Sequence, residues 1–220
     1  MTHGPDPVEA RRRYDEMAVD YDRHLGLQSS RLGRYQEGVR KRAVAALQLK
    51  PGQTVIDVGC GTGASFVRLV AAVGRDGRVV GVDQSPGMLA VATKRIADQG
   101  WANVELVEAP VEDARLPEAD AAIFFFAHDL MRTPAALDNV VTAVRPRGRV
   151  VTAGAKRPSL WLGPITLAAQ LVMRRYITTG EGLATPWDLL ADRLEDVTSE
   201  SLVLGAMYIA AGCRPAPSNP

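Results

Sequence analysis

Apolar and polar positions along the chain follow two alternating patterns. Short runs of β-branched and aliphatic residues, such as 54–58 (TVIDV) and 78–82 (RVVGV), predict buried strands. The longer segments between these runs place apolar residues three or four positions apart, which predicts helices that pack one face against a sheet. The alternation of strand and helix is typical of an α/β domain with a parallel sheet.

The expected elements alternate regularly as far as residue 153. Ser85-Pro86 and Thr133-Pro134 each combine a capping residue with proline at the first helical position, so each is expected to start a helix. The helices are expected at 8–24, 31–49, 62–73, 86–99 and 134–144. The strands are expected at 54–58, 78–82, 104–107, 120–126 and 149–153.

The pattern changes after the fifth expected strand. Apolar spacing predicts a helix over 159–175 and another over 185–194, with no strand between them. Two further strands are then expected at 199–204 and 206–211, joined tightly at Gly205. Because such a hairpin joins neighbouring strands that run in opposite directions, it requires one antiparallel strand in an otherwise parallel sheet.

Composition narrows the class of protein. The chain has 220 residues, of which 46% are apolar and 23% are charged, as in a single globular domain. Its 26 basic and 25 acidic residues give a net charge of +1, which makes no electrostatic case for a nucleic acid partner. Cys60 and Cys213 lie far apart, so no metal site is expected and a reducing compartment is the simplest interpretation.

Targeting signals are not evident in the sequence. The N-terminal residues contain no apolar signal segment, and no apolar run reaches the roughly 18 residues that a membrane-spanning helix needs. We therefore expect a cytoplasmic protein without membrane insertion.

The most informative segment is a glycine loop between the first expected strand and the helix that follows it. Gly59, Gly61 and Gly63 lack side chains, so a ligand can lie against their backbone. The start of the next helix offers free N–H groups and a partial positive charge. In an open α/β sheet, ligands bind at the carboxyl ends of the strands, which is where this loop is expected.

The loop alone fits more than one ligand. Gly59-x-Gly61-x-x-Ala64 matches a dinucleotide fingerprint, and Asp83 at the end of the next strand suits the ribose of either a dinucleotide or another nucleoside. A tight turn without any ligand is a further alternative. A dinucleotide is disfavoured because Asp57, buried within the strand, would repel a pyrophosphate but suits an ammonium group. The acidic segment 111–113, the closing hairpin and the N-terminal helices also depart from a plain dinucleotide fold.

These motifs together resemble the class I S-adenosylmethionine-dependent methyltransferases. The resemblance covers about residues 8–213 and rests on VIDVGCGTG, VVGVDQSPGML, VEDARLP, DAAIFFFAHD and RPRGRVV, with YDEMAVDYDR near the start. It implies a three-layer Rossmann-like fold, with a seven-stranded, mostly parallel sheet and a terminal antiparallel hairpin. The implied organisation is one methyltransferase domain over 1–213, followed by a disordered tail over 214–220. Within the domain, a helical cap is expected over 8–49 and an acceptor lid over 156–195.

The resemblance implies contacts to the methionine end of S-adenosylmethionine. Gly59, Cys60 and Gly61 would cradle this part of the cofactor, and Asp57 would favour its ammonium group. The backbone around Phe126 would border it. Tyr14 and Tyr21 would fold over the sulfonium, although their spacing of two helical turns also suits a helix pinned to the core.

A second set of contacts would hold the nucleoside. Asp83 would accept hydrogen bonds from the ribose hydroxyls, while Gln84 and Met88 would flank the adenine. The N–H of Val111 and the carboxylate of Glu112 would read the adenine edge. The family often has aspartate where Glu112 stands, and Met88 also suits a purely packing role.

The acceptor side is less defined by the sequence. His128 follows the fourth expected strand, where an imidazole suits a base for an acceptor hydroxyl or amine, or simply a polar loop position. Residues 126–129 (FAHD) lack the Asn/Asp-Pro-Pro-Tyr/Phe motif of DNA and protein amide methylases. The segment 156–195 is strongly apolar around Trp161 and is bracketed by basic residues. This composition suits a pocket for an apolar small molecule, with or without an anionic end. It equally suits a helix packed on the sheet.

The expected function is methyl transfer from S-adenosylmethionine to a small, apolar acceptor at O, N or C, with S-adenosylhomocysteine as product. A cyclase or another non-methylating enzyme of the same fold is an alternative, as are an NAD(P)-dependent oxidoreductase and a non-enzymatic binding module. The expected partner is the small-molecule acceptor, and a homodimer is left open.

Overall fold

The computed structural model describes residues 31–157 and 182–217, together with Arg12. Apart from Arg12, the helices predicted over 8–24 and 159–175 lie outside the described residues, and with them Tyr14, Tyr21 and Trp161. Within the described part of the chain, no helix combines the length and apolar character that crossing a bilayer requires.

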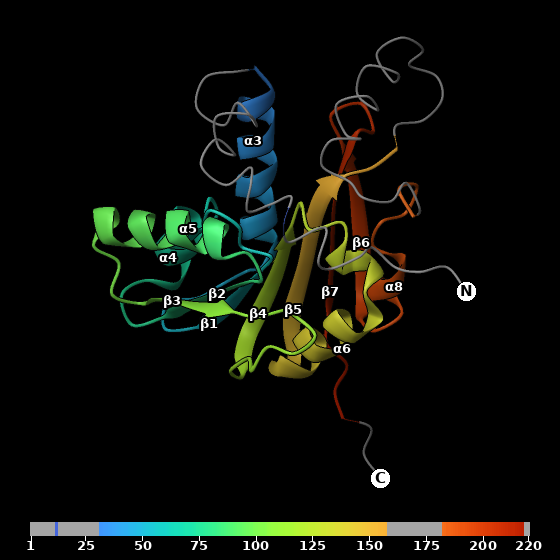
Figure 1. Cartoon of the computed structure of the whole chain (residues 1–220). Coiled ribbons are helices and arrows are strands. Elements are labelled where there is room, and N and C mark those ends of the chain that lie inside the picture. The colour runs from blue at the N-terminus through green and yellow to red at the C-terminus, as the bar shows by residue number, and fades with distance from the viewer. Residues whose placement is uncertain (1–11, 13–30, 158–181, 218–220) are drawn as a thin grey trace.

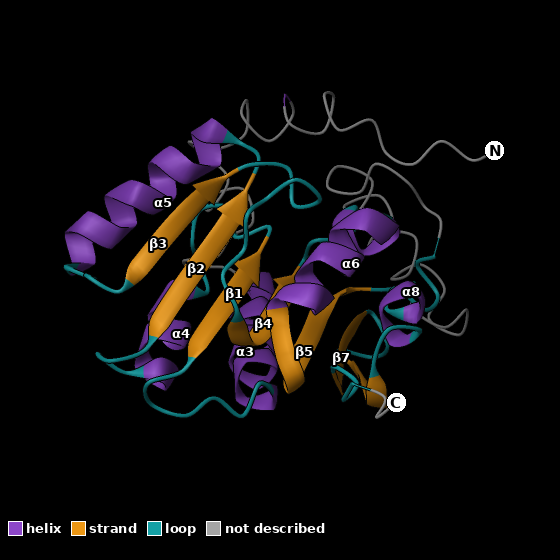
Figure 2. Ribbon diagram, turned by 90° about the horizontal axis from the view of Figure 1, so that it is seen from below, coloured by secondary structure: helices purple, strands orange, loops and turns teal. Residues whose placement is uncertain are grey.

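A seven-stranded sheet forms the centre of the molecule, with the strand order β3-β2-β1-β4-β5-β7-β6. Its strands are β1 (Thr54–Val58), β2 (Arg78–Asp83), β3 (Val104–Glu108), β4 (Ala119–Phe125), β5 (Val144–Ala155), β6 (Glu195–Leu202) and β7 (Met207–Cys213). The first five are parallel, while β7 runs antiparallel to both β5 and β6. Figure 2 shows β3, β2 and β1 side by side with their arrowheads at one edge. The predicted fold, including its closing hairpin, is confirmed.

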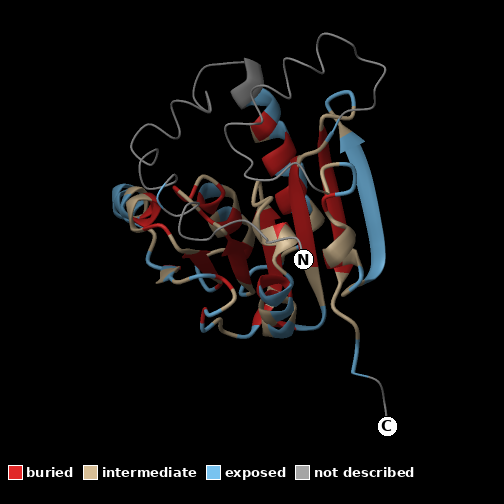
Figure 3. Ribbon diagram, turned by 45° about the vertical axis from the view of Figure 1, so that its right-hand side comes forward, coloured by how far each residue is buried: buried red, intermediate tan, exposed pale blue. Residues whose placement is uncertain are grey.

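Helices cover both faces of the sheet (Figure 1). The first face packs against α3 (Arg31–Ala46), α4 (Phe66–Val73) and α5 (Pro86–Gln99), and the second against η2 (Leu130–Arg132), α6 (Pro134–Ala143) and α8 (Asp188–Ala191). Successive strand residues point to opposite faces, so Val55 joins the first core and Ile56 the second. Figure 3 shows the buried strands between these layers and the exposed edge strand β6.

Capping explains why α5 agrees with its prediction. The Oγ of Ser85 accepts a hydrogen bond from the N–H of Met88 (3.1 Å), Pro86 occupies the first turn, and Gly100 ends the helix with φ of 64°. The similar Thr133-Pro134 start of α6 works differently. Thr133 makes no side-chain cap, because its hydroxyl donates to the carbonyl of Asp129 (3.0 Å).

Several predicted boundaries were wrong. The helix expected from residue 62 begins at Phe66, because residues 62–65 form turns around Gly63, whose φ is 72°. The helix expected over 185–194 is confined to α8. Strand β5 starts earlier than expected, where Val144 pairs with Ala119 of β4. Strand β6 also starts earlier, because Glu195 and Thr198 pair with β7. Arg214, assigned to the tail, exchanges backbone hydrogen bonds with Gly148 and Arg147.

Two glycines allow a matched test of this packing. A Cβ on Gly77 would lie 2.5 Å from the Val73 carbonyl oxygen and 2.7 Å from that of Gln53, whereas a Cβ on Gly38 in α3 meets nothing within 4 Å. Gly77→Ala should therefore lower the free energy of unfolding by about 1–3 kcal/mol. Gly38→Ala should raise it by about 0.5–1 kcal/mol, because alanine loses less conformational entropy in a helix. Denaturant titration measures both, and equal effects would contradict the close packing at Gly77.

Candidate functional site

The glycine loop folds across the carboxyl ends of β1 and β2. The N–H groups of Gly59 and Cys60 both donate to the carbonyl of Val82, at 2.8 and 3.1 Å. Gly59, Gly61 and Gly63 have φ of 66°, 52° and 72°, a region that side chains rarely adopt. Because glycine has no side chain, these three residues leave the loop backbone uncovered, as a ligand cradle requires.

Asp83, at the end of β2, turns its carboxylate toward this loop. Oδ2 accepts a hydrogen bond from the N–H of Gly61 (2.9 Å), and Oδ1 accepts one from the N–H of Ser85 (3.0 Å). A carboxylate oxygen that accepts one hydrogen bond retains capacity for a second. The loop and the carboxylate predicted for the ribose thus lie together.

Asp57 is buried in the interior strand β1, with 2% of its surface exposed. Its neighbours in register are Gly81 of β2 and Ile123 of β4. Burial raises the pKa of Asp57 from 3.8 to about 7. The positive charge of Arg40 opposes this shift, whereas the negative charge of Asp83 adds to it. Oδ2 has no hydrogen-bond partner among the described residues. A buried acid in this condition favours a cationic ligand group.

Arg40 is a charged site residue that the sequence analysis missed. It comes from α3, is only 6% exposed and stacks its guanidinium on the Phe125 ring, 4.4 Å from the ring centroid. Its Nη1 donates to Glu37 (2.9 Å), while its Nε has no partner within the described ranges. A signal was available, since Arg40 shares the spacing of the buried Ala43 and Leu47 on one face of the helix.

The residues predicted to surround the adenine divide into two places. Met88 is buried beside the glycine loop, because a Cβ on Gly61 would lie 4.0 Å from its sulfur, and Gln84 is half-buried directly after β2. Val111 and the half-buried Glu112 lie on the loop after β3, the strand next to β2.

This loop after β3 is fixed by a residue of α6 that the sequence analysis did not identify. The side-chain amide of Asn139 donates to the carbonyls of Val111 (2.7 Å) and Ala114 (2.9 Å). Two hydrogen bonds from one side chain hold the backbone of the loop in place, so its exposed groups are presented in a defined conformation.

The segment after β4 packs directly against the glycine loop. A Cβ on Gly59 would lie 3.0 Å from Leu130 and 3.3 Å from Ala127, which are two residues after and one residue before the half-buried His128. Phe126 has φ of 58°, uncommon for a side chain of this size, and donates its N–H to Ala153 on β5 (2.8 Å). Cys60 points instead into the core, where burial raises the pKa of its thiol well above the usual value.

Two described parts of the predicted acceptor lid, which was expected over 156–195, meet beside η2. The N–H of Arg157 donates to the carbonyl of Leu183 (2.7 Å), so the chain leaves β5 and returns at the same place. Arg132 of η2 then pairs with Asp188 of α8 (2.8 Å). Residues 158–181 lie outside the described residues.

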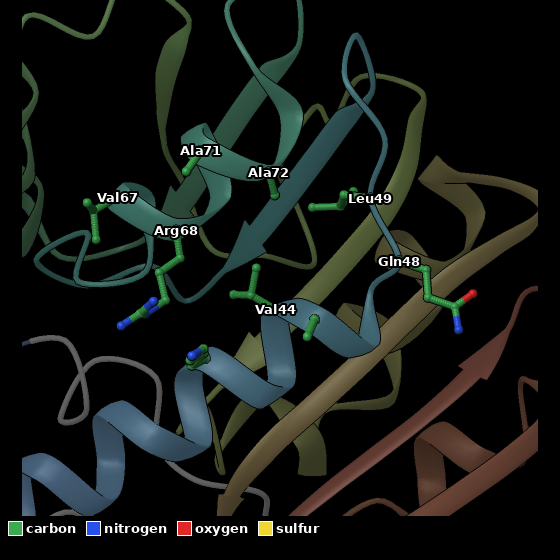
Figure 4. Close-up of a pocket in the computed structure, with 9 residues that line it drawn as sticks. Val44, Gln48, Leu49, Val67, Arg68, Ala71 and Ala72 are labelled. Carbon is green, nitrogen blue, oxygen red and sulfur yellow. The ribbon is translucent and has the colours of Figure 1, made fainter.

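A separate groove of about 510 Å³ lies between α3 and α4. Figure 4 shows Val44, Ala71 and Ala72 along it, with Arg68 near one end. None of the site residues predicted from the sequence lines this groove. We therefore separate it from the cluster at the carboxyl edge of the sheet, where the charged and backbone groups converge.

Comparison with known proteins bears on the family and the fold of the chain. Residues 55–148 match a family model described as a methyltransferase domain. Two curated relatives, from Desulfitobacterium hafniense and Symbiobacterium thermophilum, are both named demethylmenaquinone methyltransferase. They are 29% and 30% identical to the chain over 153 and 162 residues, which is 67% and 70% of this chain. The matches cover 58% and 63% of the relatives, so the chain spans about three fifths of their length.

Solved structures share the fold. The cyclase SpnF superimposes with a TM-score of 0.71 over 98% of each chain, at 14% sequence identity, which is a likeness of fold alone. The matched segment of the family model begins in β1 and runs through the glycine loop to β5. Sequence match and fold therefore concern the same part of the molecule, and the chain belongs to the class I S-adenosylmethionine-dependent methyltransferases.

Proposed function

We propose that this protein transfers a methyl group from S-adenosylmethionine to a small apolar acceptor. The observation that carries the proposal is the buried carboxylate of Asp57, whose Oδ2 has no hydrogen-bond partner among the described residues. Taking such a group out of water is costly unless a cation or a donor meets it. The α-ammonium group of S-adenosylmethionine has both properties.

The other described residues fit the remaining parts of the cofactor. The backbone of the glycine loop suits the methionine segment, and the buried guanidinium of Arg40 suits its carboxylate. The carboxylate of Asp83 suits the ribose hydroxyls. For the adenine we propose Gln84 and Met88 at its faces, with the Val111 and Glu112 loop at its edge.

Bound S-adenosylmethionine supplies a methyl group that its sulfonium charge has already activated. The protein then has to align the acceptor and exclude water, which converts a bimolecular encounter into a positioned reaction. We assign His128 to remove a proton from the acceptor, because Ala127 and Leu130 of the same segment pack against Gly59 of the cofactor loop. The backbone of Phe126 would border the same space.

The acceptor we propose is a quinone-type aromatic ring with an apolar substituent. Two observations support this class: the apolar composition of 156–195 in the sequence, and the name demethylmenaquinone methyltransferase carried by the relatives. A ring hydroxyl is also the kind of group from which a histidine can remove a proton. The whole lid segment would then cover the acceptor.

The proposed reaction is tested by incubating the protein with S-adenosylmethionine and a panel of reduced short-chain naphthoquinones, phenols and amines. Mass spectrometry should detect S-adenosylhomocysteine together with a methylated quinone-type product. Cofactor binding without acceptor-dependent S-adenosylhomocysteine would contradict methyl transfer to this class.

Asp83→Ala should weaken S-adenosylmethionine binding by about 1.5–3 kcal/mol, because hydrogen bonds to a charged acceptor are lost. Asp83→Asn, which keeps an acceptor oxygen, should lose less. Calorimetry measures both against Asp98→Ala, a change on the exposed side of α5 that should leave the affinity intact. An unchanged affinity in Asp83→Ala would refute the ribose assignment.

The affinity for S-adenosylmethionine should rise between about pH 6 and about pH 8. Burial raises the pKa of Asp57 to about 7, so the carboxyl is mainly protonated below that pH in the free protein. A cationic ligand binds the ionised form better, which gives up to about a tenfold gain per pH unit below the pKa. Asp57→Asn should bind weakly and without this gain. Calorimetry at a series of pH values measures this affinity. A wild-type affinity that does not change with pH would contradict the role of Asp57.

His128→Ala should lower the turnover number about 10²-fold while leaving cofactor affinity within about twofold, because a general base acts on the acceptor alone. His128→Asn, a polar side chain that is not a base, should be equally slow. Steady-state rates and calorimetry separate the two effects. Full activity in His128→Asn would show that shape or polarity, and not proton removal, is the requirement.

A further inference from the structure

The turn between β6 and β7 exposes two adjacent apolar side chains. Leu204 is 74% exposed, the highest value among the large apolar residues that the structure describes, and Val203 is 36% exposed. Both have positive φ, 53° and 50°. Asparagine and glycine adopt this region readily, whereas a β-branched residue does so only with strain. The turn thus carries apolar residues where polar ones are easier to accommodate.

Strand register fixes where this turn lies. Met207 of β7 is opposite Ala155 of β5, so the turn extends beyond the carboxyl end of β5. The glycine loop and His128 follow β1 and β4, which run parallel to β5, and therefore lie at the same edge of the sheet. In Figure 1 the turn is at the end of the molecule to which the β5 arrow points.

Basic groups border the turn. The backbone N–H of Lys156 donates to the carbonyl of Ala206 (3.0 Å), and its Nζ donates to Ser201 (2.8 Å). The next residue, Arg157, is exposed. The acidic residue of β6 closest to the turn in sequence, Glu200, forms an ion pair with Arg42 of α3, which offsets its charge. The rim around the turn is therefore apolar at its tip and cationic at its base.

We propose that this turn, Val203 and Leu204 with Lys156 and Arg157, docks the protein onto an anionic lipid bilayer. Exposed apolar side chains can enter the acyl boundary while neighbouring cations meet the phosphate headgroups. With two apolar residues and two cations, the attachment is weak and reversible. The inference rests on the proposed function in one respect. Docking would place the carboxyl edge of the sheet, where the acceptor is proposed to bind, against the lipid bilayer in which an apolar acceptor dissolves.

Co-sedimentation of the full chain with vesicles of equal parts phosphatidylglycerol and phosphatidylcholine tests the proposal. Leu204→Asn should reduce vesicle binding about tenfold, since it removes the main inserting side chain while asparagine tolerates the positive φ of the turn. Arg157→Gln should reduce it about fivefold, and added salt should weaken the wild type. The melting temperature of Leu204→Asn should not fall.

Val197→Asn is the matched control, because Val197 is also exposed on β6 (38%) but lies away from the turn. It should bind vesicles as the wild type does. Equal losses in the two variants, or a wild type that ignores anionic vesicles, would overturn the proposal. So would a dimer, seen by light scattering, that Leu204→Asn converts to a monomer without any change in vesicle binding.

Methylation of a soluble acceptor separates the two proposals. Leu204→Asn should retain this activity, because among the described residues no backbone hydrogen bond joins Val203 or Leu204 to the groups assigned to the cofactor or the reacting atoms. Vesicle binding by a protein that methylates no acceptor would count against the proposed function and in favour of the docking turn. A wild-type protein that methylates the soluble acceptor fully but does not bind vesicles would overturn the docking proposal alone.

Discussion

The carboxyl edge of the sheet is organised around a single buried charge. Asp57 lies on the interior strand β1 between β2 and β4, where it is almost fully shielded from water. A carboxylate in this position has to be neutralised by a proton, by a nearby cation or by a ligand. The raised pKa of Asp57 and the buried Arg40 on α3 are two partial solutions to the same electrostatic constraint.

This constraint extends outward through alternating charges. Arg40 donates to Glu37, and Glu37 also accepts a hydrogen bond from the Nε of Arg68 on α4 (2.6 Å). Acid and base thus alternate from the sheet to α3 and on to α4. Because these groups come from three elements, the chain of charges ties the helices of the first face to the strand that carries Asp57. The same helices border the groove of Figure 4.

The second face of the sheet includes a neutral buried pair beside β5 and β7. The hydroxyls of Tyr208 on β7 and Thr152 on β5 are hydrogen-bonded (3.0 Å), and burial raises the pKa of Tyr208 to about 12, so it keeps its proton. Its ring packs against Trp187, which in turn lies under the amine of Lys156. Aromatic packing therefore supports the base of the docking turn.

The sequence determined the parts of this protein that depend on neighbouring residues. The apolar run 54–58, the Ser85-Pro86 cap and the glycines of 59–63 act locally, so the strand, the helix and the loop could be predicted from their own residues. The resemblance to a known family supplied the expected site residues. Boundaries failed where a partner elsewhere in the chain decided them, as at β6, whose length is set by its pairing with β7.

Only the tertiary structure decided which distant residues meet. Arg40 reaches the site because α3 packs over Phe125, and Asn139 holds the loop after β3 because α6 lies on the second face. The exposed turn at Leu204 joins the acceptor edge through the register of β5 and β7. These relations depend on long-range packing and pairing, for which the local pattern of apolar and polar residues carries no information.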